Sequence, residues 1–175
     1  MKITTIKPNF DRSQLKLPSD RPTGVIYLPA DFYAFRIAMR RLWMKPKIGF
    51  LNLLMDPVGL RPHIVHAIPE HMEMEVGEQA VGQCGVPAEE QIPYACTQAV
   101  VALRSKYKHL FWAPDVEIQE NKALYKVIFI ERGDGETWLY DTYTGKKILV
   151  ENPYFDPKSG FPGSAQVQTE DKQQL

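Results

Sequence analysis

The sequence predicts an α+β fold in which one helix packs on an antiparallel β-meander. Two observations in residues 94–150 predict it. Apolar residues first recur at spacings of three and four, which is the period of a helix with one apolar face. These residues are Cys96, Ala99, Val100, Leu103 and Tyr107. Runs of β-branched and aromatic residues follow, separated by turn residues, as in a meander. An N-terminal strand-helix-strand part and extended terminal arms complete the predicted fold.

The chain begins with a segment that shows no sustained hydrophobic period. Residues 1–21 carry scattered charges and two prolines, and we expect an extended arm. A strand-helix-strand subdomain is expected next, over residues 22–68. Its first strand is predicted at 23–28, where an apolar run follows Gly24 and stops at Pro29.

A helix is predicted over residues 32–43, with Asp31 as its N-cap. Its apolar stripe would consist of Phe32, Phe35, Met39 and Leu42. Two strands are predicted after it, at 48–55 and at 60–68. Pro62 favours an edge position for the second strand.

Residues 69–93 lose this pattern in Glu, Gly, Gln and Pro, so a long surface loop is expected there. Residues 22–68 also resemble residues 94–150 in the order of helix, apolar strand, Asp and closing Gly. Either 22–68 is a degenerate second copy of the module, or the likeness is chance turn chemistry.

Four strand-like runs make up the predicted meander. They are residues 112–120, 122–132, 136–141 and 148–150. Tyr125, Val127 and Phe129 alternate as one half-buried face of the second run. Gly133-Asp134-Gly135 supplies the positive φ angles of a tight hairpin, and Gly145 closes the next turn.

The segments ALYKVIFIE and ETWLYDTYTGKKIL, with the Gly/Asp turn between them, resemble the PepSY module. The closing signature of that module is an aromatic or aliphatic strand that ends in Asp, followed by Thr-Gly and an aliphatic residue. The resemblance covers residues 94–150. It implies a helix on a sheet and a non-catalytic role in which the module binds or restrains a peptidase. Most PepSY modules occur in secreted or membrane-associated proteins.

Composition argues against several functional classes. The 175 residues include 21 basic and 21 acidic side chains, so the bulk charge gives no reason to expect nucleic acid or an anionic membrane as a partner. No apolar run approaches the ~20 residues that span a bilayer, and the N-terminal residues lack the pattern of a secretory signal. We therefore expect a cytoplasmic or virion-associated protein with no membrane partner.

No residue pattern predicts catalysis, a metal or a cofactor. His63 and His66 lie three apart on a predicted strand, so their side chains point to opposite faces and cannot share a metal without a bulge. The serines form no nucleophile elbow, and the glycines at 77, 82 and 85 do not form a phosphate loop. The sequence therefore predicts that the protein is not an enzyme and holds no metal or cofactor.

The two cysteines leave two alternatives open. Cys84 and Cys96 could form a disulfide, but Cys96 lies on the predicted apolar face of the helix. A buried free thiol is the commoner state of such a residue.

One local cluster of basic residues could contact phosphate. Arg36, Arg40 and Arg41 share one side of the predicted helix, and Trp43, Lys45 and Lys47 follow them. Charged helix faces are usually just solvated, and this is the simpler interpretation. Weak nucleic-acid contact through the basic helix 36–47 is the alternative.

Aromatic residues are more numerous than one sheet face can hide, which is typical of protein contacts. The candidate contact residues are Trp112, Trp138, Tyr140, Tyr143, Tyr154, Phe155 and Phe161. Alternatively, the N-terminal helix or the C-terminal tail covers these aromatic residues within the chain. The tail, residues 151–175, is rich in proline and glycine and is expected to order on a partner.

The sequence therefore predicts a non-catalytic protein-binding module whose partner is another protein, a peptidase if the resemblance holds, or copies of itself. The alternative is a structural subunit of a repeating assembly such as a virion, tail or filament. The extended arm, the tail and the lack of a secretory signal favour that alternative.

Overall fold

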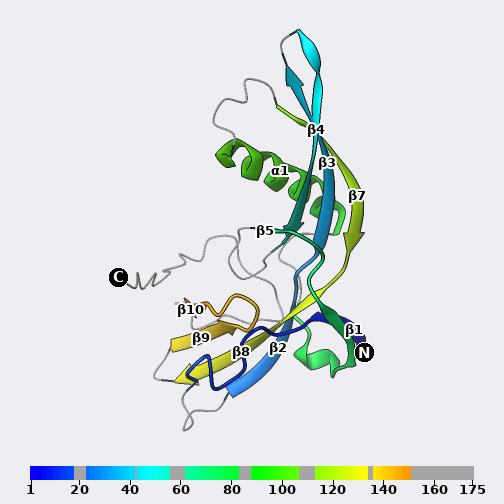
Figure 1. The fold of residues 1–175 in the computed structure, drawn as a ribbon. Helices are drawn as coiled ribbons and strands as arrows, with labels where there is room; N and C mark the ends of the chain where they lie inside the picture. Colours follow the sequence, from blue (N-terminus) through cyan, green and yellow to red (C-terminus); the bar gives the residue numbers. More distant parts are fainter. Residues whose placement is uncertain are drawn as a thin grey trace, which may run out of the picture. The chain divides into compact units, whose positions relative to one another are not determined.

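The structure is a computed structural model that describes residues 1–17, 23–41, 43–55, 62–82, 88–106, 113–133 and 136–150. These residues form ten strands in two sheets, one α-helix and one short 3-10 helix (Figure 1). The fold is therefore mostly β, and the predicted α+β fold of a helix on a meander is wrong. The chain divides into two compact units, each made of segments that are distant in sequence.

The first unit contains the described residues of 1–29, 70–85 and 124–150. Its sheet has the order β10-β9-β8-β1-β6, and β2 pairs with β8. The strands are β1 (Lys2–Ile6), β2 (Thr23–Pro29), β6 (His71–Glu75), β8 (Tyr125–Gly133), β9 (Glu136–Asp141) and β10 (Lys147–Val150). All pairs are antiparallel except that of β1 with β8. Of the four strands of the predicted meander, the last three are adjacent here as β8-β9-β10, but the first, predicted at 112–120, corresponds to β7 (Asp115–Lys122) of the other sheet.

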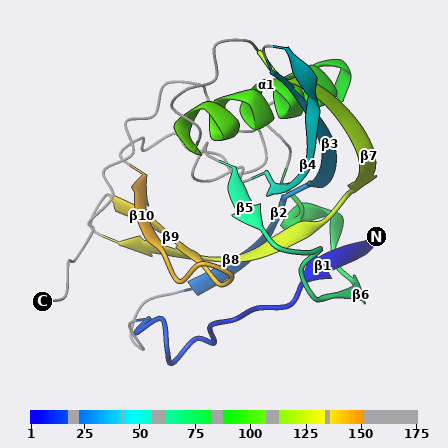
Figure 2. The ribbon, with the colours of Figure 1, turned by 45° about the horizontal axis from the view of Figure 1, so that its top comes forward.

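The second unit contains the described residues of 30–69 and 86–123. Its four-stranded sheet has the order β5-β4-β3-β7. The elements are β3 (Phe32–Arg41), β4 (Met44–Leu54), β5 (His63–Val65), α1 (Ala88–Lys106) and β7 (Asp115–Lys122). Figures 1 and 2 show α1 lying across one face of β3, β4 and β7.

The core of the second unit forms between α1 and that sheet face. Three elements contribute its buried residues. They are Tyr33, Phe35 and Ile37 of β3, Leu51 and Leu53 of β4, and Ala95, Ala99 and Leu103 of α1. The sheet residues recur at a spacing of two and the helix residues at spacings of four, so each element presents one apolar side to the other. The helical stripe through Ala99 and Leu103 is therefore confirmed, but it covers β3, β4 and β7 rather than the meander.

The predicted helix over residues 32–43 is wrong, because Phe32–Arg41 is the strand β3. The segment fits two periods. A period of two, as in a strand, is formed by Tyr33, Phe35, Ile37 and Met39, which alternate with exposed or half-exposed residues. The helical period of 3.6 fits Phe32, Phe35 and Met39 equally well. Pairing on both sides, with β4 and with β7, decides between the two periods.

Two segments that were expected to lack regular structure pair with each other. Strand β1 lies in the predicted arm 1–21 and β6 lies in the predicted loop 69–93, and they are antiparallel from Lys2↔Glu75 to Ile6↔His71. The 3-10 helix η1 (Glu78–Ala80) and the start of α1 also lie in residues 69–93. Each strand is only five residues long, which is too short for its alternation to stand out in the sequence.

Other strand predictions agree with the structure to different degrees. The strand at 23–28 is confirmed as β2, and the strand at 48–55 is part of the longer β4. Of the strand predicted at 60–68, the structure describes residues 62–68, and among these His63–Val65 forms a strand. Tyr125, Val127 and Phe129 are half-buried as predicted, while Lys126, Ile128 and Ile130 form the buried face of β8. No helix in the described part of the chain is both long and apolar enough to cross a membrane.

Truncating Leu103 should destabilise the protein, because its side chain is 4% exposed between α1 and the sheet. We expect Leu103→Ala to lower the free energy of unfolding by about 2–5 kcal/mol. Val101→Ala on the same helix is the matched control, since Val101 is 54% exposed, and it should change stability by less than about 0.5 kcal/mol. Urea denaturation measures both values, and equal losses in the two variants would contradict this packing.

Candidate functional site

The β3–β4 hairpin is longer than the rest of its sheet. Strands β3 and β4 pair from Phe32↔Leu54 to Arg41↔Met44. Strand β7 pairs with β3 only as far as Ala38↔Asp115. Residues 39–41 and 43–47 therefore extend beyond β7 as a two-stranded ribbon, whose tip is drawn in cyan in Figure 1.

One face of this hairpin carries exposed apolar side chains. Leu51 and Leu53 contribute to the core beneath α1, so Ile48 and Phe50 lie on the opposite face of β4. We call the exposed residues Met44, Ile48 and Phe50 the apolar stripe; their exposed fractions are 63%, 43% and 77%. Contiguous exposed apolar residues of this kind mark interaction sites more often than scattered ones do.

The arginines of β3 that face β7 are ion-paired. Arg36 lies 3.3 Å from a carboxylate oxygen of Glu117, and Arg40 lies 3.4 Å from one of Asp115. All four side chains are largely exposed, so each pair contributes at most about 1 kcal/mol. These pairs neutralise the hairpin where it runs beside β7.

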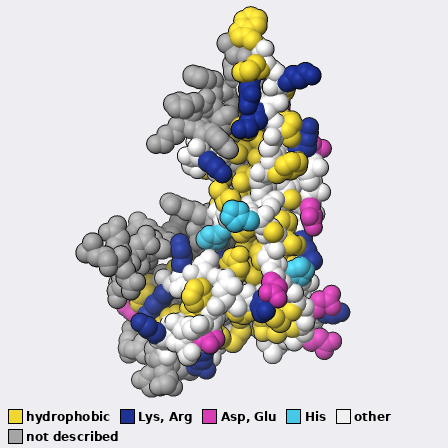
Figure 3. All heavy atoms as spheres, viewed as in Figure 1, with side chains coloured by type: hydrophobic (Ala, Val, Ile, Leu, Met, Phe, Trp, Pro, Cys, Tyr) yellow, Lys and Arg dark blue, Asp and Glu magenta, His cyan; other side chains and the backbone are white. Residues whose placement is uncertain are grey.

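The tip of the hairpin differs in its charges. Arg41, Lys45 and Lys47 are exposed and make no ion pair with any described residue. Between them lies Trp43, whose side chain is 95% exposed. Figure 3 shows hydrophobic and basic side chains together at this end of the second unit. The basic helix predicted over 36–47 is therefore wrong in its secondary structure, and its cations lie on a hairpin.

Trp43 has a left-handed backbone conformation, with φ of 62°. This region is unfavourable for a bulky L-residue, and turns of this kind normally use glycine or asparagine. The side chain gains little packing in return, because it is almost fully exposed. The conformation thus has a cost that the fold does not recover through burial of the indole ring.

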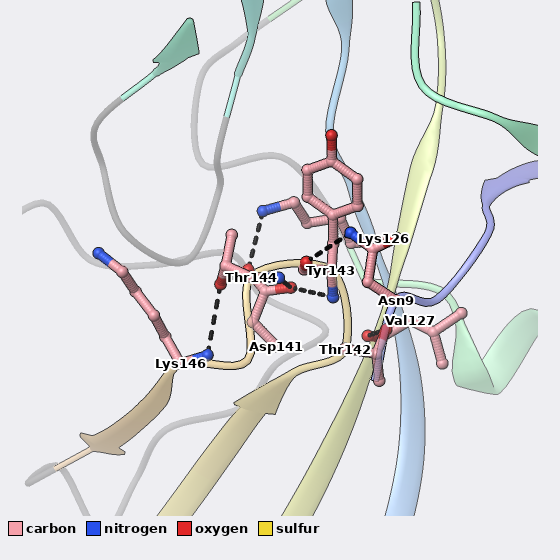
Figure 4. Close-up of polar contacts among 8 residues, drawn as sticks. All are labelled: Asn9, Lys126, Val127, Asp141, Thr142, Tyr143, Thr144 and Lys146. Atoms are coloured by element: carbon pink, nitrogen blue, oxygen red, sulfur yellow. Dashed lines mark hydrogen bonds and ion pairs between the residues drawn. The ribbon is translucent and has the colours of Figure 1, made fainter. Parts of the chain in front are cut away.

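The turn at residues 141–146 in the first unit is organised by a buried ion pair. Lys126 Nζ lies 2.8 Å from Asp141 Oδ2, and both side chains are almost completely buried (Figure 4). The other carboxylate oxygen accepts hydrogen bonds from the backbone N–H groups of Tyr143 (2.8 Å) and Thr144 (3.2 Å). The Thr144 hydroxyl donates to Asp141 Oδ2 at 2.8 Å. The Asp141 carboxylate therefore accepts four polar contacts and caps the whole turn.

Gly145 and Thr142 complete the same turn. Gly145 has φ of 72°, and a Cβ at this position would lie 3.0 Å from the ring of Phe10, so both the backbone angle and the neighbouring ring favour glycine. The Thr142 hydroxyl donates to the Val127 carbonyl oxygen at 2.7 Å. Asp141, Thr142, Thr144 and Gly145, which belong to the closing signature of the PepSY resemblance, thus all have structural contacts within the first unit.

The structure describes three of the aromatic residues predicted as a contact surface, and they differ in burial. Tyr140 is buried and its hydroxyl donates to Glu131, which is also buried. Trp138 is half-buried beneath Lys147, whose ammonium lies 3.9 Å from the ring centre, and Tyr143 is half-buried in the Asp141 turn. The remaining candidates lie outside the described residues: Trp112, Tyr154, Phe155 and Phe161.

The described residues contain no group of three or more His, Cys, Asp or Glu that could hold a metal ion. His63 lies on β5 of the second unit, whereas His71 lies on β6 of the first. Cys96 is a free, half-buried thiol, and desolvation raises its pKa, which disfavours the reactive thiolate. Cys84 lies outside the described residues.

The sequence analysis missed the apolar stripe. Its signal was the alternation of Met44, Ile48 and Phe50 with polar or small residues, which identifies a two-faced strand once Leu51 and Leu53 are assigned to the core. Comparison with family models, curated proteins and solved structures finds no match to this chain. The case for a function therefore depends on the geometry described above.

Removing the Asp141 carboxylate should destabilise the first unit. We expect Asp141→Asn to lower the free energy of unfolding by about 3–5 kcal/mol, because it leaves the buried Lys126 ammonium facing an amide. Glu117→Gln is the control, since it removes one member of an exposed pair and should cost at most about 1 kcal/mol. If thermal denaturation gives equal losses, the buried pair does not hold the turn.

Replacing Trp43 by glycine should stabilise the hairpin relative to alanine. Alanine keeps the Cβ that disfavours φ of 62°, whereas glycine adopts this angle without strain. We expect Trp43→Gly to be about 1 kcal/mol more stable than Trp43→Ala. Urea denaturation of the two variants measures the difference, and a less stable glycine variant would refute the strained turn.

Proposed function

We propose that the chain is a non-catalytic protein-binding module that contacts its partner through the apolar stripe on β4. The observation that supports this proposal is the exposure of Phe50, 77% in the middle of a long strand. Its cross-strand partner Arg36 on β3 and its neighbour Asn52 on β4 lie on the same side of the hairpin and are polar, so Phe50 has little apolar surface beside it apart from Ile48. An aromatic side chain in this position is better placed for an intermolecular contact than for folding.

The energetics favour such a contact. Burying a Phe side chain completely is worth about 1.5–3 kcal/mol before the cost of association. Arg36 and Arg40, with their carboxylate partners, lie along the same hairpin. An apolar centre with a charged rim is the usual anatomy of a protein interface.

Two kinds of partner are consistent with this proposal. The PepSY resemblance implies a peptidase, although its closing signature, residues 136–149, belongs to the first unit and the apolar stripe belongs to the second. A second copy of the chain would instead support a subunit of a repeating assembly. The C-terminal tail, which first suggested an assembly, lies outside the described residues.

Site-specific crosslinking tests the proposal and separates these partners. A photoreactive phenylalanine analogue is placed at Ile48, beside Phe50 on the apolar stripe, and a control carries it at Val101 on α1, where it is equally exposed. We expect partners that are crosslinked from position 48 but not from position 101. A crosslinked peptidase would support the resemblance, and a crosslinked second copy would support an assembly.

The Phe50→Ala change provides the second arm of this experiment. It removes the most exposed aromatic ring of the stripe and, because that ring is 77% exposed, should leave the thermal midpoint within a few degrees of the wild type. We expect it to abolish the crosslinks from position 48. Crosslinks that are unaffected by Phe50→Ala, or identical from positions 48 and 101, would refute the apolar stripe as a contact surface.

A further inference from the structure

We propose that the tip of the β3–β4 hairpin binds single-stranded nucleic acid, with Arg41, Lys45 and Lys47 contacting phosphates and Trp43 stacking on a base. This site goes beyond the protein contact centred on Phe50. It uses the turn and the residues that flank it, and its cations lie beyond the part of β3 that pairs with β7.

The charges of the tip are suited to a polyanion. Residues 39–47 contain four basic side chains and no acidic one. Arg40 is paired with Asp115, but the other three cations make no ion pair with any described residue and are exposed. Lys45 and Lys47 are two residues apart on one strand, so they lie on the same face, about 7 Å from each other. A row of cations at this spacing can follow a phosphate backbone.

Trp43 supplies the second element of such a site. Its indole ring is 95% exposed at the turn, with Arg41 and Lys45 close on either side in the sequence. Exposed aromatic rings beside basic groups bind single strands by stacking, which is tolerant of sequence because every base has a π-face. Its strained backbone conformation is the kind of cost that is kept at functional positions.

An anionic membrane is the competing partner for a basic tip with a tryptophan. Segments that lie in a membrane interface bury a continuous apolar face 5–10 Å deep. At this tip, Trp43 and Met44 are followed at once by Lys45, and Arg41 and Lys47 are also near. Insertion of the tip would therefore bury only two apolar side chains, which do not make up a continuous apolar face. The alternation of cations with a single aromatic ring favours stacking and phosphate contact.

The salt dependence of binding gives a quantitative test. Three phosphate contacts to a single strand predict a slope of log K against log salt of about −2, which is roughly a 20-fold loss of affinity between ~50 and ~200 mM salt. The assay uses the full chain and the fluorescence anisotropy of a labelled oligonucleotide of about 12 nucleotides, within the usual range of site sizes. No binding at the lowest salt would overturn the proposal.

Two variants separate the phosphate contacts from stacking. Lys45→Gln with Lys47→Gln should reduce the slope to about −0.7, because one of three phosphate contacts remains. Trp43→Ala should weaken binding about 5- to 150-fold and leave the slope unchanged, since stacking releases no counterions. A slope that the double lysine variant does not change would overturn the assignment of these cations.

The matched control removes the same charge elsewhere. Arg104 on α1 and Arg132 on β8 are exposed and make no ion pair with any described residue, so Arg104→Gln with Arg132→Gln lowers the net charge equally. We expect this control, and Phe50→Ala, to bind the oligonucleotide as the wild type does. Vesicles containing phosphatidylserine complete the test, because Trp43-dependent binding to vesicles without binding to the oligonucleotide would identify a membrane site and overturn the proposal.

Discussion

The second unit depends on one constraint: a sheet has two faces, and its single described helix covers only one of them. Tyr33, Phe35 and Ile37 direct the apolar face of β3 towards α1, and this fixes which residues of β3 and β4 lie on the other face. On β3 that face has the composition expected of a solvated sheet, with Ala34, Arg36 and Ala38. On β4 it does not, because Ile48 and Phe50 are apolar. The apolar stripe thus differs in composition from the neighbouring part of β3 on the same face.

The first unit contains a buried charge pair that fixes the geometry of a turn more than it adds to net stability. Burying Lys126 and Asp141 costs desolvation energy that their attraction only partly recovers, so an apolar pair would serve stability as well. An apolar residue at 141 could not accept hydrogen bonds from Tyr143 and Thr144, however, and the turn would lose its cap. The Asp and Thr-Gly residues of the PepSY resemblance therefore each have a structural role in the turn they form.

Local patterns in the sequence predicted several elements correctly. The stripe of α1 and the alternation in β8 each have one dominant period, and both are present. Strand β3 was missed because Phe32, Phe35 and Met39 fit a helical period while Tyr33, Phe35 and Ile37 fit a strand, and Asp31 resembled an N-cap. Only the pairing of β3 with strands on both sides decides between helix and strand. One of these strands, β7, begins more than 70 residues later in the chain, so no local pattern contains this information. The choice of sheet beneath α1 is non-local for the same reason, because the two units interleave along the sequence.

The relative lengths of β3, β4 and β7 also explain how a chain with no net charge has a basic tip. Acidic side chains of β7 neutralise two arginines of β3: Glu117 lies opposite Arg36 in the register, and Asp115, which lies opposite Ala38, pairs diagonally with Arg40. Asp115 is the first residue of β7, so the supply of acidic partners from that strand ends there. The hairpin continues past this point, and Arg41, Lys45 and Lys47 have no carboxylate opposite them on a neighbouring strand. The boundary between paired and unpaired cations is therefore set by where β7 begins, and it cannot be derived from the composition of the chain.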